Sequence, residues 1–215
     1  MDETTAELRD AHDELAELYA ERLADSLDRA PVDRAVLGLF CDLLAERDGG
    51  AAVGDIGCGS GRMSGYLARR GPAPHGIDLS PEMVRVARRD HPGIPFEVAD
   101  LRRLPFADGE LSGVLCWYSL MYLPPAERPR GFAELARVVR PGGLLATAFK
   151  LGDDRVRRGG RSVGVEFDVY WLSMGEMERR LVTAGFRIVF RGEGPPSPDD
   201  LAPPQCYGYV VAERG

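Results

Sequence analysis

The chain has 215 residues, 44% of them hydrophobic, and a formal net charge of −7. This length allows one domain with a sizeable core, and the acidic balance argues against a general binder of nucleic acid or membrane surfaces, which would present a basic face. No apolar stretch approaches the ~20 residues that a membrane-spanning helix needs. The N-terminus, Met1-Asp2-Glu3, lacks the basic and apolar segments of a secretory signal, and the four cysteines are scattered. We therefore expect a cytoplasmic protein with free thiols and no metal.

Two helices are predicted within residues 5–46. Leucines between Leu8 and Leu27 form a loose helical stripe, and a stricter i, i+3, i+4, i+7 pattern follows. Pro31 suits the first turn of the second helix, and Asp48-Gly49-Gly50 is predicted to end it. The stricter stripe consists of Val32, Ala35, Val36, Leu39, Phe40, Leu43 and Leu44. We assign residues 1–48 to a helical cap and 49–215 to the core of one structural domain.

Strands alternate with helices from residue 51 onward. The predicted strands are 51–56, 76–79, 96–99, 111–119, 144–149, 186–190 and 207–212. The predicted helices between them are 61–70, 80–89, 132–139 and 174–184. Arg140-Pro141-Gly142-Gly143 is read as a turn, 152–164 as a loop and the proline-rich 194–204 as irregular. Because no full helix separates the last two strands, we expect a hairpin there. The fold class is α/β: a Rossmann-like, doubly wound sheet of seven strands, mostly parallel with one antiparallel strand.

A glycine-rich loop follows the first of these strands. Gly57, Gly59 and Gly61 allow sharp turns and a close approach of the backbone to a ligand. Asp78 ends the next strand about 20 residues on, at the position where an acidic residue would hydrogen-bond to the ribose hydroxyls of a nucleotide. The third glycine comes one residue earlier than in the dinucleotide pattern. Asp55 at the strand end would repel a pyrophosphate but suits a cationic ligand. Both features argue against the alternative of a nicotinamide-dependent oxidoreductase.

Four segments together resemble class I S-adenosylmethionine (SAM)-dependent methyltransferases of the small-molecule type found in actinobacteria. The resemblance extends from about Tyr19 to Glu213. Its segments are Val53 to Gly61, Gly76 to Met83, Phe96 to Leu101, and Gly113 to Pro125 with the later Leu135 to Gly143. A single glycine loop is weak support, whereas four segments in the family's order and spacing are strong support.

The resemblance implies SAM as cofactor, S-adenosylhomocysteine (SAH) as product, and a role for each matching residue. The glycines and Asp55 would shape the methionine site, and Asp78 would accept hydrogen bonds from the ribose hydroxyls. Leu79 and Met83 would enclose the adenine ring. Asp100 and the backbone N–H of Leu101 would form hydrogen bonds with its edge. The remaining implied cofactor contacts are Trp117 and Tyr118 after the fourth strand and Tyr19 as a closing lid residue.

The catalytic residue and the acceptor are harder to identify, because methyl transfer needs a general base only for some acceptors. Similar proteins often carry histidine at the position of Tyr122, and an unperturbed tyrosine, with a pKa near ~10, is a poor base. His12 is the second weak candidate, with a solvated helix face as its alternative. The candidate acceptor residues are Tyr118, Tyr122, Lys150, Tyr170 and Trp171. Four arginines could capture an anion or form a solvated loop: Arg155, Arg157, Arg158 and Arg161.

The sequence thus predicts a methyltransferase acting on an O or N atom of a small organic molecule, and secondary metabolism is the expected context. Its alternatives are a non-catalytic SAM-binding accessory protein and the oxidoreductase mentioned above. The expected partner is the small-molecule acceptor alone, with no nucleic acid and no membrane, and the protein is expected to be a monomer or homodimer.

Overall fold

The computed structural model describes residues 2–47, 51–196 and 205–215. The α-helices are α1 (Glu3–Leu23), α2 (Pro31–Ala45), α3 (Arg62–Arg70), α4 (Pro81–Asp90), α5 (Arg128–Val138) and α6 (Met174–Thr183). The strands are β1 (Ala52–Ile56), β2 (Ala73–Asp78), β3 (Phe96–Val98), β4 (Leu111–Trp117), β5 (Val139–Lys150), β6 (Val156–Gly159), β7 (Phe167–Tyr170), β8 (Phe186–Gly194) and β9 (Tyr207–Arg214). Short 3₁₀ turns are η1 (Ser26–Arg29), η2 (Leu120–Tyr122) and η3 (Arg161–Val163).

Seven strands form one sheet in the order β3-β2-β1-β4-β5-β9-β8. β9 pairs antiparallel with both β5 and β8, while the pairs among β1 to β5 are parallel. The predicted α/β class, seven-stranded sheet and terminal hairpin are confirmed. The order reverses between β1 and β4, and in open α/β sheets ligands bind at this point, beyond the carboxyl ends of the strands.

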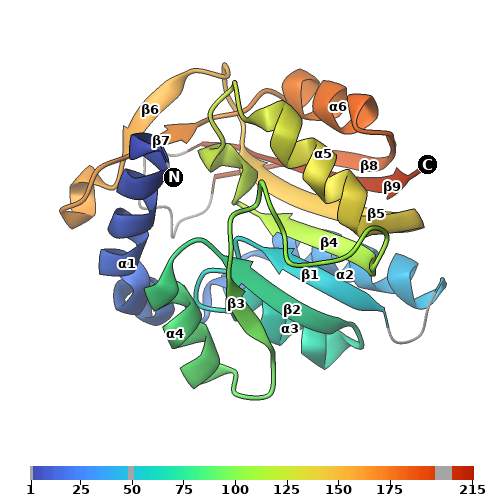
Figure 1. The fold of residues 1–215 in the computed structure, drawn as a ribbon, viewed down its shortest axis with the longest axis horizontal. Helices are drawn as coiled ribbons and strands as arrows, with labels where there is room; N and C mark the ends of the chain where they lie inside the picture. The colour runs from blue at the N-terminus through green and yellow to red at the C-terminus, as the bar shows by residue number, and fades with distance from the viewer. Residues whose placement is uncertain (1, 48–50, 197–204) are drawn as a thin grey trace.

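Helices cover both faces of the sheet (Figure 1). Along β4, Leu115 and Trp117 belong to a hydrophobic cluster with α2 and α3, whereas Val114 and Cys116 belong to a cluster with α5 and α6. The predicted continuous apolar strand is therefore buried on both faces, as its composition indicated. α1 stands apart, at one end of the sheet between the β6–β7 hairpin and α4 (Figure 1). Of the predicted helical cap, α2 thus packs on the sheet and α1 stands over its edge.

Three sequence predictions are corrected. The 152–164 region contains β6, which pairs with β7 as a separate two-stranded sheet, so Val156–Gly159 is a strand and not part of a loop. Residues 140–143 belong to β5, where the pairing with β4 shifts between Leu111 and Gly113 and Gly142 takes a φ of 75°. In α2, Ala35 is exposed and Leu37 is fully buried, because the buried face is rotated from the predicted stripe. The predicted stop at 48–50 and most of the irregular 194–204 lie outside the described residues.

No helix in the described part of the chain is long and apolar enough to cross a membrane.

Candidate cofactor and acceptor site

A cavity of about 530 Å³ lies at the carboxyl edge of the sheet. Its floor comes from the ends of β1, β2, β4 and β5, and α1, η2 and the β6–β7 hairpin form its other walls. The predicted residues that line it are Tyr19, Gly57, Gly59, Asp78, Leu79, Met83, Asp100, Leu101, Trp117, Tyr118, His12, Tyr122, Lys150 and Trp171. The structure therefore brings most of the predicted cofactor and acceptor residues to one place.

The three loop glycines are required for different reasons. All three have positive φ values, which glycine adopts without strain (77°, 53° and 82°). A Cβ on Gly57 would lie 2.3 Å from the Ser119 Cβ, so close packing excludes a side chain there. A Cβ on Gly59 would have its nearest neighbour, the Met83 sulfur, 3.9 Å away, so this position faces open space. Gly59 therefore leaves room for a ligand, whereas Gly57 serves the packing of the loop.

The Asp78 carboxylate joins the loop to the next helix. One oxygen accepts from the Gly59 N–H at 2.8 Å and the other from the Ser80 N–H at 2.9 Å. Burial raises the pKa of Asp78 against the effect of these bonds, which favour the charged form. Ser80 in turn caps α4 by accepting from the Met83 N–H at 3.0 Å, which confirms the predicted start of that helix. Asp78 thus projects from a rigid turn into the cavity.

Asp55 lies beneath the loop and is not among the residues that line the cavity. Its side chain is 1% exposed and accepts from the Ser64 hydroxyl on α3 at 2.6 Å. Gly61 is likewise outside the lining residues and begins α3, close to His91 and Phe96. Both residues organise the loop from below.

Part of the chain is similar to known methyltransferases. Residues 53–143 match a family model described as a methyltransferase domain. The chain is 36% identical over 99 residues to a malonyl-[acyl-carrier protein] O-methyltransferase of Pectobacterium atrosepticum, covering 46% of this chain and 38% of that protein. It is 36% identical over 117 residues to a demethylmenaquinone methyltransferase of Beutenbergia cavernae, covering 54% and 48%. The matched segment thus spans less than half the length of these relatives.

Solved structures share the whole fold. Magnesium protoporphyrin IX methyltransferase from Synechocystis, solved with bound SAM, aligns with a TM-score of 0.73 at 19% identity, covering 100% of this chain and 99% of that one. A SAM-dependent methyltransferase from Methanosarcina mazei aligns with a TM-score of 0.70 at 21% identity, covering 78% and 93%. Residues 53–143 thus form a methyltransferase domain, and the fold of the chain is that of SAM-dependent methyltransferases.

The residues that line the cavity fit SAM as the cofactor of this methyltransferase domain. The open position at Gly59 is a cradle that a side chain would fill, and Asp78 provides carboxylate oxygens beside it. A ribose diol needs such an acceptor. Leu79 and Met83 lie next to Asp78 along the cavity wall, on the side where the adenine is predicted to bind.

At the predicted adenine end, Asp100 is already engaged by an arginine. Arg102 donates from Nε to both Asp100 oxygens, at 2.9 and 3.1 Å. Burial would raise the pKa of Asp100, but the hydrogen bonds from Arg102 outweigh it and the pKa is lowered. Asp100 is therefore a fixed carboxylate at the edge of the cavity, and its contact with adenine stays a prediction.

The predicted acceptor residues divide into two groups. Tyr122 and Trp171 line the cavity, whereas Tyr170 does not and instead packs its ring 5.0 Å from the Arg128 guanidinium. Burial raises the pKa of Tyr122 well above its usual value, so this phenol is not a base near neutral pH. His12 is enclosed among aromatic rings inside the cavity, so the alternative of a solvated helix face is wrong.

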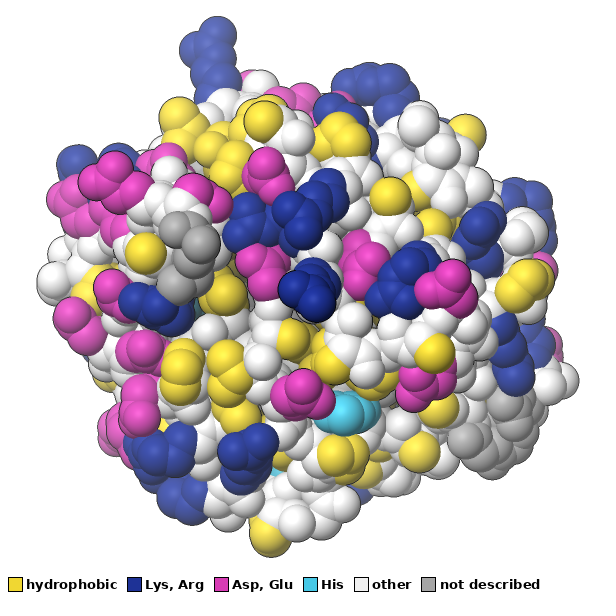
Figure 2. All heavy atoms as spheres, viewed as in Figure 1, with side chains coloured by type: hydrophobic (Ala, Val, Ile, Leu, Met, Phe, Trp, Pro, Cys, Tyr) yellow, Lys and Arg dark blue, Asp and Glu magenta, His cyan; other side chains and the backbone are white. Residues whose placement is uncertain are grey.

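The four loop arginines form ion pairs within the protein. Arg157 pairs with Asp153 at 2.8 Å and covers the Trp171 ring at 4.1 Å. Arg158 pairs with Glu7 and Asp168, Arg161 with Glu166, and Arg155 lies 3.6 Å from Asp153. These contacts favour the structural alternative over anion capture. On the face shown in Figure 2, positive and negative side chains are interleaved in the same way.

Sequence reasoning missed a buried carboxylate in the cavity wall. Asp33, in the first turn of α2, is 6% exposed and accepts from the Tyr209 hydroxyl at 2.6 Å and the Tyr118 hydroxyl at 3.1 Å. Tyr118 has a φ of 61°, which is rare for a residue with a side chain. The spacing along the sequence could have revealed it. Asp33 lies four residues before Leu37 and seven before Phe40, so it shares the buried face of α2 with them. Asp33 thus fixes Tyr118 in a strained conformation at the end of β4.

Proposed function

We propose that this protein transfers the methyl group of SAM to an oxygen or nitrogen atom of a small organic molecule. The observation that carries the proposal is the shared cavity. Asp78 and the open position at Gly59 lie on one wall, and His12, Tyr122 and Trp171 line the same space. A cofactor bound at Asp78 and an acceptor held by the aromatic residues would share one cavity, and an in-line transfer needs the two held together in this way.

The chemistry comes from the cofactor, and the protein supplies binding and orientation. SAM, when bound, offers a methyl group on a positively charged sulfur. Asp78 holds the ribose, and the glycine loop brings the backbone close to the methionine part. The aromatic residues on the opposite wall exclude water and orient the acceptor.

A cavity of about 530 Å³ supports a small acceptor. The names of similar proteins are varied: malonyl-[acyl-carrier protein] and demethylmenaquinone methyltransferases among the relatives, and a Burkholderia thailandensis 1,6-didemethyltoxoflavin N1-methyltransferase that aligns with a TM-score of 0.62 at 22% identity, covering 94% of this chain and 89% of that one. The walls of this chain's cavity are rich in aromatic side chains, which favours an organic acceptor of modest size, of the kind modified in secondary metabolism.

Calorimetry with SAM tests the proposal. We expect Asp78→Ala to weaken SAM binding by about 1.5–3 kcal/mol, because a charged hydrogen-bond acceptor for the ribose is lost. Asp78→Asn keeps the size of the side chain but can accept only one of the two backbone hydrogen bonds, and it should lose most of the same affinity. Asp108→Ala removes an exposed aspartate outside the cavity and should bind SAM like the parent protein.

Absence of SAM binding at high micromolar concentration would overturn the proposal, as would unchanged affinity in both Asp78 variants. Formation of SAH in the presence of acceptor candidates separates an enzyme from a non-catalytic SAM-binding protein.

A further inference from the structure

His12 occupies a specific place in the cavity. It lies on α1, and its ring centroid is 5.2 Å from that of Tyr122, 5.0 Å from that of Phe167 and 6.0 Å from that of Tyr19. These rings come from η2, β7 and α1, so three separate elements meet around the imidazole. Neither of the other two histidines lines the cavity: His75 packs against Phe106, and His91 against Phe96.

One hydrogen bond fixes the tautomer of this ring. His12 Nδ1 lies 2.9 Å from the Leu8 carbonyl oxygen, one turn earlier in α1. Because a carbonyl oxygen only accepts, Nδ1 must carry the hydrogen, and the neutral ring then has its lone pair on Nε2. Within the described part of the chain, Nε2 has no hydrogen-bond partner. The ring is thus held by one nitrogen and keeps the other as an acceptor for a ligand.

The surroundings keep the ring neutral. Burial lowers the pKa of His12, although Asp78 at the end of β2 and Asp13 on α1 favour its charged form. Burial also raises the pKa values of Tyr19 and Tyr122, so both phenols stay protonated beside it, and β7 contributes the uncharged Phe167. Arg9, one turn before Asp13, is the remaining charged group of α1 on the cavity wall near the ring. Near neutral pH, His12 is therefore a neutral imidazole that lines the cavity.

We propose that His12 is the general base of the transfer and that the acceptor is a hydroxyl compound, a phenol or an alcohol. The acceptor oxygen forms its bond to the methyl carbon as the carbon–sulfur bond breaks and leaves its electron pair on sulfur. The hydroxyl proton passes to His12 Nε2, and the resulting imidazolium, close to Asp78 and Asp13, later releases it to solvent. This inference rests on the proposed function and adds the acceptor class to it.

Nuclear magnetic resonance of the full chain with ¹⁵N-labelled histidine tests the inference, with His12→Asn and His75→Asn used to assign the signals. The free protein should show the Nδ1–H tautomer at His12. SAM and SAH differ by one positive charge at sulfur. We therefore expect the pKa of His12 to be lower in the SAM complex than in the SAH complex by at least about half a pH unit. His75 and His91 should titrate alike in both.

Equal His12 pKa values in the two complexes would overturn the inference, because the ring would then be far from the reacting sulfur. An Nε2–H tautomer would overturn it as well. His12→Asn should bind SAH within about threefold of the parent, and a loss of tenfold or more would make His12 a cofactor-binding residue and not the base. If neither SAM nor SAH binds, the proposed function itself fails, and that outcome is distinct from all of these.

Discussion

At the scale of single residues, Asp55 carries an energetic cost that other contacts must offset. Its carboxylate is buried under the glycine loop and accepts hydrogen bonds from the hydroxyl and the backbone N–H of Ser64. Burial raises its pKa to about 6, although the Ser64 hydroxyl favours the charged form. The folded protein therefore holds the Asp55 proton more tightly than the unfolded chain does.

The sign of the pH effect follows from this shift. Below about pH 4 the group is protonated in both states, whereas between about pH 4 and pH 6 only the unfolded chain ionises, so the stability of the fold decreases as the pH rises. The difference from the ordinary pKa corresponds to about 3 kcal/mol above pH 6. We expect Asp55→Asn, which keeps an acceptor for Ser64, to be more stable than the parent above pH 6 in the absence of cofactor.

Thermal unfolding of both proteins across this pH range measures the effect. The two melting temperatures should converge toward pH 4 and separate as the pH rises. A constant difference at every pH would show that the ionisation of Asp55 does not contribute.

Several residues of the site could be predicted because their roles are local. Ser80 and Pro81 begin a helix by capping chemistry, and the loop glycines mark positive φ values. Asp33 could not be placed in this way. Its partners Tyr118 and Tyr209 are 85 and 176 residues away along the chain, and only the folded sheet brings them together.

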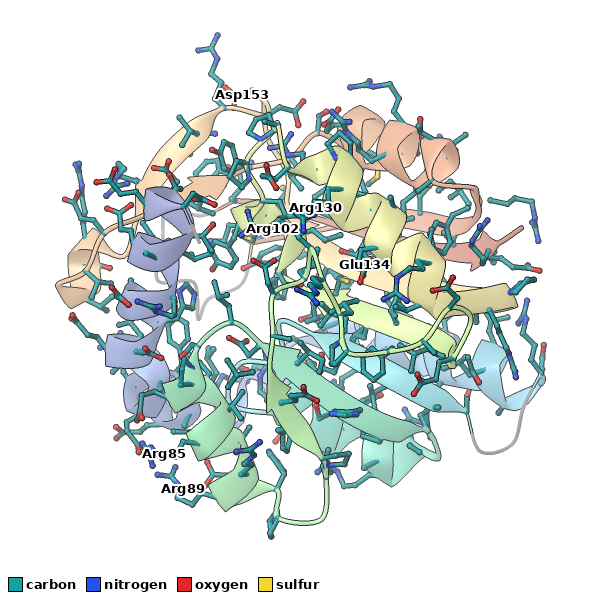
Figure 3. All side chains as sticks on the ribbon, viewed as in Figure 1. Arg85, Arg89, Arg102, Arg130, Glu134 and Asp153 are labelled. Atoms are coloured by element: carbon teal, nitrogen blue, oxygen red, sulfur yellow. The ribbon has the colours of Figure 1, made fainter. Side chains whose placement is uncertain are left out.

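At the scale of elements, α1 is held over the cavity by ion pairs in addition to apolar packing. Arg85 and Arg89 on α4 reach Glu17 at 2.7 and 2.8 Å, Arg158 on β6 reaches Glu7, and Arg102 lies 3.3 Å from Asp2 (Figure 3). The apolar side of α1 packs through the buried Ala11, Leu15 and Ala16, with the half-buried Leu8, Leu18, Tyr19 and Ala20 beside them. Because exposed ion pairs each contribute only about 0.2–1 kcal/mol, α1 should open more readily than the sheet.

Salt should therefore loosen α1 selectively. At 1 M NaCl the screening length falls to about 3 Å, and we expect amide hydrogen exchange over Glu3–Leu23 to accelerate about three- to tenfold. The amides of β4 provide the internal control, because they are buried in the centre of the sheet. Glu17→Gln should reproduce part of the effect at low salt. If salt leaves exchange in α1 unchanged, apolar packing alone holds this helix.

The β6–β7 hairpin shows why this part of the site was not predicted. Phe167, Asp168 and Val169 alternate as a strand would, but the segment is short and β6 is rich in arginine and glycine. What stabilises the hairpin is its contact with α1, including the Phe167–His12 packing and the Arg158–Glu7 pair. A local pattern contains no information on such a partner.

At the scale of the whole molecule, β4 connects the two hydrophobic layers. Leu115 is fully buried and packs with the α2–α3 layer, while its neighbours Val114 and Cys116 face the opposite layer. Any cavity opened here lies in the centre of the sheet, where neighbours on both faces limit relaxation.

We expect Leu115→Ala to lower the free energy of unfolding by about 2–5 kcal/mol, measured by chemical denaturation. Val182→Ala, at a position on α6 that is 59% exposed, should change it by less than about 0.5 kcal/mol. A small effect at Leu115 would mean that the two layers can collapse onto each other.

The sequence by itself determined the alternating α/β order, the glycine loop and the position of Asp78, because each depends on residues close together in the chain. Hydrophobic period, capping and turn chemistry are local, and they were sufficient for the fold class, whereas the methyl donor was implied by the resemblance of the motif segments to a known family. The tertiary structure alone decided the placement of α1 over the cavity, the enclosure of His12 by rings from three elements, and the burial of Asp33. These depend on contacts between distant segments, whose geometry arises only when the sheet, its covering helices and the hairpin pack together.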